Sequence, residues 1–314
     1  MTIRTAYRHR RAATTVTFAA VLGLLTAGCT SSEPEQSPGV NWDAVNRALG
    51  MPLHIEDGGV HAIEWLRTDL HVVNAGVTLD PGMELVAEAD FRETTPGNVV
   101  MIGEAALTTE ELNAVGPRLE QGGVEITAIH KHLQDETPRL FALHYAAYGD
   151  PAPIARTLRE ALARTGIPLG QSPEVEGDQA PIDLDTTAID TILGATGEVE
   201  HGTYHVRVPV AQKVTETRAD VTLPPQMEAS TLLMFQPLGG GKVAINGDFA
   251  MTADQVNPVI AALRSHDIQV IELHNHMLHE SPRLFYLHFW ATGDAAILAQ
   301  GLRAGLDQVR APRR

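Results

Sequence analysis

The residues whose types and spacing could do chemistry lie in a block at positions 274–288, which has the sequence HNHMLHESPRLFYLH. A second block, at positions 130–144, has the sequence HKHLQDETPRLFALH and is identical at nine of the 15 positions. The two blocks share three histidines and one glutamate. These residues are His274, His276, His288 and Glu280 in the later block, and His130, His132, His144 and Glu136 in the earlier one.

Three neutral imidazoles and a carboxylate suit zinc or another first-row divalent transition metal, which binds about four nitrogen or oxygen ligands. We therefore treat these eight residues as candidate metal ligands. The spacing His-x-His-x3-Glu is similar to the first half of the cupin metal motif, but Ile268 and Leu287 occupy the places of its flanking glycines, so no cupin is assigned. An alternative stays open, in which the histidines form the polar face of an amphipathic strand.

Each block is interpreted as a β-hairpin, with a first strand that ends near His276 and a second strand over 283–289. Side chains alternate between the two faces of a strand, so His274 and His276 share one face. With the turn centred on Ser281, His274 lies opposite His288 and three imidazoles converge. The other face then carries an apolar stripe, formed by Phe285, Leu287 and Phe289 in the later block and by Phe141, Leu143 and Tyr145 in the earlier one.

The two blocks belong to an internal duplication with a constant offset of 144 residues, so that Gly103-Glu104, for example, corresponds to Gly247-Asp248. A constant offset maintained over about 120 residues indicates two copies of one unit of domain size. We predict a first repeat domain over 41–169, a linker over 170–182 and a second repeat domain over 183–310.

Each repeat shows the same predicted order of elements, β-β-β-α-β-β-α, after a short helix that ends at a glycine. The first long helix follows a capping-box sequence, Thr108-x-x-Glu111 in one copy and Thr252-x-x-Gln255 in the other. This order predicts an α+β fold, in which two tandem copies each form a mostly antiparallel sheet with helices on one face.

If helices cover the apolar face, the histidine face is the opposite one. It then either lines an open groove or packs against its counterpart in the other repeat, which would place quasi-symmetric sites at the repeat interface. Glu104 and Asp248 follow a strand and are candidate acidic additions to the site, or else solvated loop carboxylates. His61 and His205 also correspond between the copies, but an ordinary polar role on a strand accounts for them.

The N-terminus has the sequence of an export signal, with four arginines before an apolar segment too short to span a bilayer. The segment ends in LTAGC, which resembles a bacterial lipobox with threonine in place of the usual aliphatic residue. We predict a lipoprotein signal peptide over 1–28, lipidation at Cys29 and a flexible tether over 29–40. Cys29 is the only cysteine, so the chain forms no internal disulfide and no thiolate-ligated metal site.

The chain is strongly acidic, with a formal net charge of −16 that becomes −20 when the four arginines of the signal are removed. This charge argues against nucleic acid as a partner and mildly favours divalent cations. The expected partners are the membrane, through a lipid anchor at Cys29, and a protein or cell-wall component. No Gly-x-Ser-x-Gly elbow, phosphate loop or His-Glu-x-x-His helix is present, so no reaction is assigned.

The lipobox, the duplicated unit and the sequence HNHMLHESPRLFYLHFWATGD together resemble the LppY/LpqO-like family of bacterial lipoproteins, over nearly the whole mature chain. The resemblance implies an exported, envelope-anchored protein with two copies of a family domain, and it implies no catalytic residues. Two functions fit this description. One is a lipoprotein that binds a divalent metal or small ligand through its histidine blocks, and the other is a non-catalytic envelope protein that binds a protein or cell-wall partner.

Overall fold

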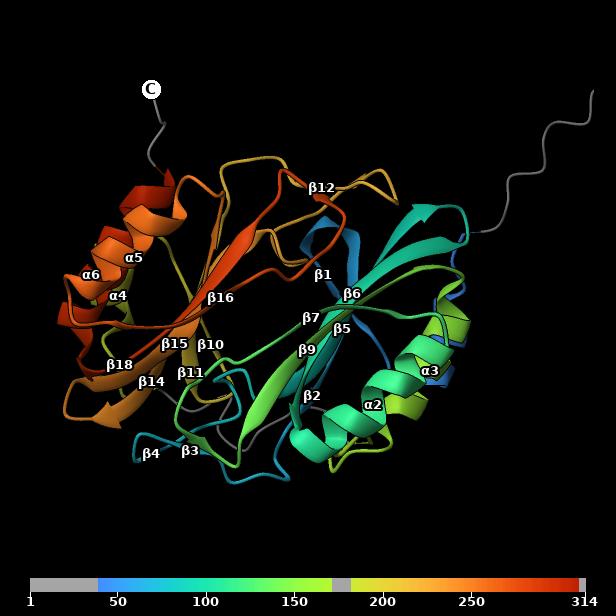
Figure 1. The fold of residues 1–314 in the computed structure, drawn as a ribbon, viewed down its shortest axis with the longest axis horizontal. Helices are drawn as coiled ribbons and strands as arrows, with labels where there is room; N and C mark the ends of the chain where they lie inside the picture. Colours follow the sequence, from blue (N-terminus) through green and yellow to red (C-terminus); the bar gives the residue numbers. More distant parts are fainter. Residues whose placement is uncertain (1–38, 171–181, 311–314) are drawn as a thin grey trace, which may run out of the picture. The chain divides into compact units, whose positions relative to one another are not determined.

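The structure, a computed structural model, describes residues 39–170 and 182–310 (Figure 1). The predicted signal peptide, Cys29 and all but the ends of the predicted tether and linker lie outside these residues. The described residues of both repeats belong to one compact unit.

The elements of the first repeat follow one another in the order α-β-β-β-β-β-β-α-β-β-β-α, apart from one 3₁₀ turn. They are α1 (Trp42–Leu49), β1 (His54–Glu56), β2 (Val60–Leu66), β3 (Val73–Asn74), β4 (Val77–Thr78), β5 (Val86–Thr95), β6 (Asn98–Thr108), α2 (Thr109–Gln121), β7 (Glu125–His130), β8 (Glu136–Thr137), β9 (Leu140–Gly149) and α3 (Pro151–Leu162).

The second repeat has the same order of elements. They are α4 (Thr186–Leu193), β10 (Glu198–Glu200), β11 (Thr203–Pro209), β12 (Thr215–Glu216), β13 (Val221–Thr222), β14 (Ser230–Gly239), β15 (Lys242–Met251), α5 (Val256–Arg264), β16 (Gln269–His274), β17 (Glu280–Ser281), β18 (Phe285–Asp294) and α6 (Ala295–Arg310).

Each repeat is built on one six-stranded antiparallel sheet. The strand order is β1-β2-β5-β6-β9-β7 in the first repeat and β10-β11-β14-β15-β18-β16 in the second, so the two sheets have the same topology. Each repeat also contributes a small three-stranded sheet, β4-β3-β8 or β13-β12-β17. The predicted α+β fold, with two tandem antiparallel units, is therefore confirmed.

Helices cover one face of each sheet, as Figure 1 shows for α2 and α3 in the first repeat. Leu143 and Tyr145 point into this helix-covered core, and Leu287 and Phe289 do so in the second repeat. The predicted apolar stripe is thus the face under the helices. Phe141 is the exception, because it is only half-buried and lies outside the core.

Local sequence explains where the helices begin and end. Helix α1 ends at Gly50, whose φ of 84° is a left-handed conformation that glycine adopts without strain. Helix α2 begins with a complete capping box, in which Thr108 and Glu111 bond to each other's backbone amides. The predicted box of the second repeat is only half formed. The Gln255 side chain accepts a hydrogen bond from the Thr252 amide (2.9 Å), but α5 begins later, at Val256, and has no side-chain cap.

The uncovered faces of the two sheets face each other. Two further apolar clusters contain residues of both repeats, one with Val100 and Ala146 beside Met277, the other with Met83 beside Trp290. Of the two arrangements left open by the sequence, the structure therefore has the packed interface. Within the described residues, no helix is long and apolar enough to span a membrane.

Candidate metal centre

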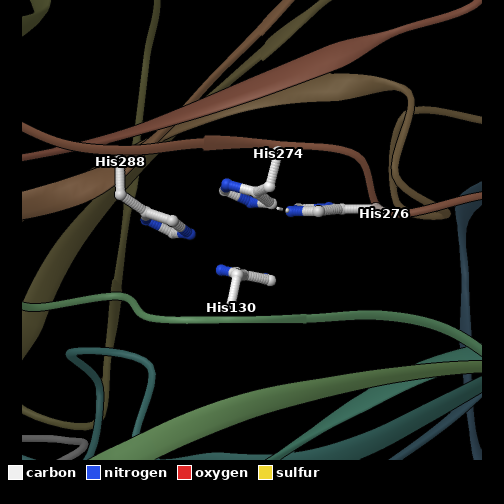
Figure 2. A group of neighbouring side chains, drawn as sticks. All are labelled: His130, His274, His276 and His288. Atoms are coloured by element: carbon white, nitrogen blue, oxygen red, sulfur yellow. Dashed lines mark hydrogen bonds between the residues drawn. The ribbon is translucent and has the colours of Figure 1, made fainter.

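The histidines of the two blocks converge at the interface between the repeats. His130, at the end of β7, stacks on His274, at the end of β16, with ring centroids 3.5 Å apart. Figure 2 shows His130 on one side and His274, His276 and His288 on the other, with the four rings pointing toward one another. His130, His276 and His288 are at most 5% exposed. The cluster is therefore shared by both repeats, whereas the sequence had suggested a separate hairpin site in each.

The predicted register of the later hairpin is wrong by two residues. His274 pairs with Tyr286, not with His288, because the segment between β16 and β18 is not a turn centred on Ser281: it contains β17, which pairs with β12. Tyr286 and His288 are two residues apart on one strand, so they still share a face. The imidazoles therefore lie on the predicted face, although their neighbours on the adjacent strand differ from the predicted ones.

Glu136 and Glu280, which we predicted as metal ligands, do not join the histidines. The block does not form a tight hairpin, because Glu280 starts β17, which pairs with β12. The Glu280 carboxylate accepts a hydrogen bond from the Leu284 amide (3.2 Å) and pairs with Arg283 (3.0 Å). Glu136 likewise accepts from the Leu140 amide (3.0 Å) and pairs with Lys131 (2.6 Å). Both glutamates thus order the loop that follows the histidines.

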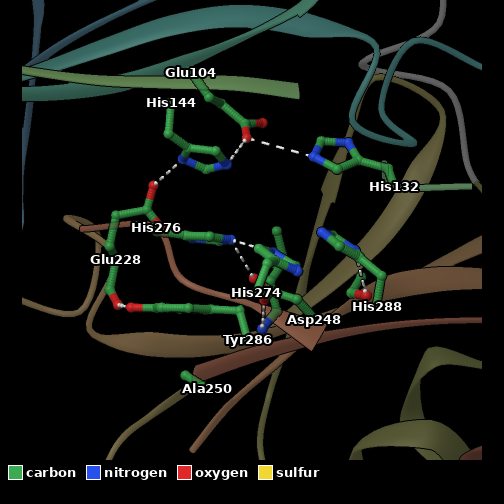
Figure 3. A network of polar contacts seen from close by, with 12 residues as sticks. Glu104, His132, His144, Glu228, Asp248, Ala250, His274, His276, Tyr286 and His288 are labelled. Atoms are coloured by element: carbon green, nitrogen blue, oxygen red, sulfur yellow. Dashed lines mark hydrogen bonds and ion pairs between the residues drawn. The ribbon is translucent and has the colours of Figure 1, made fainter. Parts of the chain in front are cut away.

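Glu228 takes the place of Glu280 as a carboxylate of the cluster. Its Oε2 lies 2.5 Å from Nδ1 of His276, and its Oε1 lies 3.5 Å from Nδ1 of His144 in the other repeat. Tyr286 supports this arrangement, because its ring stacks on His276 at 3.6 Å and its hydroxyl donates to the Glu228 carbonyl (2.5 Å). Figure 3 shows Glu228 bridging the two histidines.

Glu84 occupies the equivalent position in the first repeat. Its Oε2 lies 3.3 Å from Nδ1 of His132 and 3.7 Å from Nδ1 of His288 in the other repeat. Sequence analysis missed both Glu84 and Glu228, which precede a strand and lie far along the chain from the histidine blocks. The offset of 144 residues relates them, and both have a left-handed φ, 63° and 62°. Matching acidic residues between the copies could have found them.

Glu104 and Asp248 lie beside the histidines, as one of the two alternatives for them predicted. Oε2 of Glu104 is 3.5 Å from Nε2 of His132 and 3.0 Å from Nε2 of His144, and Figure 3 shows this bridge. Oδ2 of Asp248 is 3.5 Å from Nε2 of His276. The two carboxylates are 8% and 6% exposed, so they are not solvated loop residues.

His61 and His205 have ordinary roles outside the cluster. His61 stacks on Trp42, with ring centroids 3.6 Å apart. His205 is hydrogen-bonded to Thr203 (2.6 Å) and to the carbonyl of Gly82 (2.8 Å). These contacts agree with the expectation that both histidines have ordinary polar roles on strands.

The carboxylates hold protons on two of the histidines. Burial alone would lower the pKa of His132, but the charges of Glu84 and Glu104 outweigh burial and raise it to about 9. Burial also opposes protonation of His144, yet Glu104 and Glu228 raise its pKa to about 10. Without a metal ion, these protons neutralise part of the buried negative charge.

The remaining histidines are neutral. Burial and the neighbouring imidazoles lower the pKa of His130 and of His288 well below the usual value, and they lower that of His276 to about 4. Both ring nitrogens of His130 and Nε2 of His288 are buried and make no hydrogen bond. Buried polar atoms almost always have a partner, so these unpartnered neutral imidazole nitrogens are candidate ligand atoms.

The ligand atoms are close enough to share metal ions. Among the described residues, four groups have nitrogen or carboxylate oxygen atoms within 4.8 Å of one another, and all four lie in this cluster. They are His130-His274-His276-His288, His130-His132-His144, Glu84-His132-His288 and His144-Glu228-His276. Imidazole and carboxylate ligands suit zinc, iron and similar divalent ions.

A cavity of about 690 Å³ borders the cluster. Its walls come from both repeats and include four carboxylates that contact the histidines: Glu84, Glu104, Glu228 and Asp248. Further acidic side chains line it, among them Glu64, Glu88, Asp90 and Glu200. Burial and repulsion between the carboxylates raise the pKa of Glu88, Asp90 and Asp248, so these carboxyls hold protons that a bound cation would displace.

The fold and the cluster define a class of protein, a duplicated α+β chain whose two sheets enclose shared histidines and carboxylates. The family described as "Domain of Unknown Function (DUF1259)" matches residues 43–164 and 187–308, once in each repeat. The chain therefore belongs to this family, and the two matched segments confirm the duplication. No protein with a curated description matches the chain.

Two solved structures are similar over most of the chain but at low scores. One is the crystal structure of EtuB from Clostridium kluyveri, at 11% identity, with 82% of this chain and 89% of that chain covered and a TM-score of 0.19. The other is a trimeric bacterial microcompartment shell protein, PduB, at 12% identity, with 82% and 90% covered and a TM-score of 0.20. TM-scores this low support no inference about this chain.

Proposed function

We propose that the protein is an exported lipoprotein that binds a divalent transition metal ion, such as zinc, at the histidine–carboxylate cluster between its repeats. The observation that carries this proposal is the set of buried imidazole nitrogens without a hydrogen-bond partner, on His130, His274 and His288. Neutral imidazoles beside carboxylates are the ligands that zinc, iron and related ions take. The acidic cavity supports the proposal, because it raises the local concentration of cations beside the cluster.

The proposed location rests on the N-terminal sequence. The lipobox-like segment that ends at Cys29 and the resemblance to the LppY/LpqO-like lipoproteins support lipidation and an anchor in the cell envelope. The Ser/Pro/Glu-rich segment that follows then acts as a tether between the membrane and the folded body.

Calorimetric titration tests the metal proposal. Protein without an affinity tag is stripped with a chelator, dialysed and titrated with Zn²⁺, alongside the variant His276→Ala. We expect saturable binding by the wild type and a loss of affinity of at least about tenfold in the variant, since removal of one ligand costs about 1.4 kcal/mol or more. The surface variant His279→Ala is the matched control, because His279 is in the same block but pairs only with Glu125 (3.1 Å).

The absence of saturable binding by Zn²⁺, Fe²⁺ and Mn²⁺ would contradict the metal proposal. It would favour the second candidate, a non-catalytic envelope protein that binds a protein or cell-wall partner. Equal affinities of wild type and His276→Ala would also contradict it, because the bound ion would then lie elsewhere.

A further inference from the structure

We infer that the cluster is a binuclear centre, in which each of two quasi-equivalent ion sites takes ligands from both repeats. The inference rests on the proposed metal binding and adds the number of ions and the way their sites are assembled. It assigns one site to Glu84, His132 and His288, and the other to Glu228, His276 and His144.

The internal duplication relates the two sites residue by residue. The offset of 144 converts Glu84, His132 and His144 into Glu228, His276 and His288. The two groups are therefore one arrangement repeated about the interface. Their geometry also agrees, since the ring centroids of His132 and His288 are 4.5 Å apart and those of His144 and His276 are 4.0 Å apart.

Each site is assembled across the interface. Glu84 contacts His132 of its own repeat (3.3 Å) and His288 of the other repeat (3.7 Å). Glu228 contacts His276 of its own repeat (2.5 Å) and His144 of the other (3.5 Å). Two ligands at about 2.0–2.2 Å from one ion are at most about 4.4 Å apart, so these pairs need only small adjustments to bind an ion.

A bridging carboxylate connects the two sites. Oε2 of Glu104 lies 3.5 Å from Nε2 of His132, in one site, and 3.0 Å from Nε2 of His144, in the other. The stacked rings of His130 and His274 lie beside both groups, with the centroid of His130 5.5 Å from that of His276 and 5.2 Å from that of His288. Carboxylates that reach two ions are common in proteins with paired metal sites.

The buried nitrogens that support metal binding lie in one of these sites and beside both; in His288 the free atom is Nε2, because Nδ1 donates to the Gly247 carbonyl. His288 is 0% exposed and its Nε2 has no hydrogen-bond partner, and His130 is 2% exposed with both ring nitrogens unpartnered. These atoms lie within the cluster and are free to bind an ion. Two His-His-carboxylate sets leave further coordination positions for water or for a ligand that enters from the cavity.

Titration with Co²⁺ tests the number of ions directly. Cobalt replaces zinc in most sites of this kind and absorbs visible light when bound by a protein. We expect the absorbance of the chelator-stripped, full-length protein to rise until about two equivalents of Co²⁺ per chain are bound. A break at one equivalent would overturn the binuclear inference and leave metal binding intact. No binding at all would instead contradict the proposed function.

Paired variants test the assembly across the interface. Glu84→Gln with His288→Asn alters a single site under our assignment, so one equivalent of Co²⁺ should still bind. Glu84→Gln with His144→Asn alters both sites, so neither equivalent should bind. If each site were instead built within one repeat, the two outcomes would be exchanged, and that result would overturn the inference.

Glu88→Gln provides the matched control. Glu88 lines the same cavity and undergoes the same change of side chain, but none of the hydrogen bonds and ion pairs of the described residues joins its side chain to a histidine of the cluster. It should retain both equivalents of Co²⁺. Circular dichroism establishes whether each double variant is folded, and the stoichiometry of the wild type decides the number of ions whether or not a variant folds.

Discussion

At the scale of single residues, His276 and His279 differ sharply although three positions separate them in one block. His276 is 5% exposed and contacts Glu228 and Asp248, whereas the side chain of His279 is 32% exposed and pairs with Glu125 at the surface. This contrast separates a histidine that could hold an ion from one that could not. Alanine variants of these two histidines therefore form a matched pair for a stability measurement.

We predict that each Zn²⁺ ion bound at the cluster stabilises the wild type by about 2.7 kcal/mol when the free concentration is one hundred times the dissociation constant. In His276→Ala the increment from the altered site should fall to about 1.4 kcal/mol or less at the same concentration, because an affinity about tenfold weaker leaves that ion at only about ten times its dissociation constant. His279→Ala should retain the full increment. Denaturant unfolding with Zn²⁺ and with chelator measures all three, and a full increment in His276→Ala would contradict the prediction.

Glu111 offers a prediction that does not involve the cluster. Its carboxylate pairs with Arg67 (2.9 Å), whose side chain is fully buried, and accepts hydrogen bonds from the amides of Thr108 (2.9 Å) and Gly166 (3.0 Å). Burial raises the pKa of Glu111, but these hydrogen bonds and the charge of Arg67 outweigh it, so the net pKa is lowered.

A carboxylate with a lowered pKa stabilises the fold above its unfolded pKa of about 4.3, and this stabilisation is lost as the pH falls through the folded value. Glu111→Gln should therefore cost about 1–3 kcal/mol at pH 7 and reduce the loss of stability in acid. The control is Glu110→Gln, which substitutes the exposed neighbouring residue. It should change neither the stability at pH 7 nor the loss of stability in acid. Urea unfolding at pH 7 and at pH 4 provides the comparison. The same acid sensitivity in wild type and Glu111→Gln would rule out this role.

At the scale of elements, Gly247 brings β15 close to β14. Its φ is 126°, and a Cβ atom there would lie 2.1 Å from the carbonyl oxygen of Leu232. The Gly247 carbonyl also accepts a hydrogen bond from Nδ1 of His288 (2.9 Å), and Asp248 follows it. Gly247 therefore positions two groups of the cluster through the backbone.

We predict that Gly247→Ala destabilises the protein by about 2–3 kcal/mol, because the backbone strain of an alanine at positive φ adds to the overlap of its Cβ with backbone atoms of β14. It should also weaken metal binding, since His288 and Asp248 must shift. Gly170→Ala is the control, because a Cβ atom there has nothing within 4 Å. Chemical denaturation of both variants measures the difference, and a cost of less than about 0.5 kcal/mol for Gly247→Ala would show that β14 adjusts freely.

The elements also show how far sequence reasoning reaches. The constant offset, strand parity and capping residues were enough to predict two antiparallel units, the face under the helices and the face of the histidines. They were not enough for the register of β16 and β18, because this register depends on the conformation of the segment 275–284 that connects the two strands. Nor did spacing reveal that Glu280 begins β17 and pairs with β12.

At the scale of the whole molecule, the limit was the packing of one repeat against the other. Glu84 and Glu228 each contact a histidine of the opposite repeat, His288 and His144, in addition to one of their own repeat. Periodicity within a block describes one strand and its neighbours, whereas contacts between sheets depend on how two domains pack. The shared nature of the cluster therefore emerged only from the structure.

The membrane anchor is a property of the whole chain. We predict that Cys29→Ser leaves the body folded but releases it from the membrane fraction, because the acyl chains attached to this cysteine would supply the anchor. Fractionation of cells that produce wild type or variant, followed by immunoblotting, measures this. A variant that remains in the membrane fraction would show that another segment or partner holds the protein there.

The most direct test of the metal centre is elemental analysis of full-length protein purified without an affinity tag and without chelator. We predict that inductively coupled plasma mass spectrometry finds a first-row transition metal in near-stoichiometric amounts, and that a chelator removes it and lowers the melting temperature. Protein that contains no such metal, and whose melting responds neither to chelator nor to added Zn²⁺, would contradict the claim that the histidines of the two repeats form a metal site.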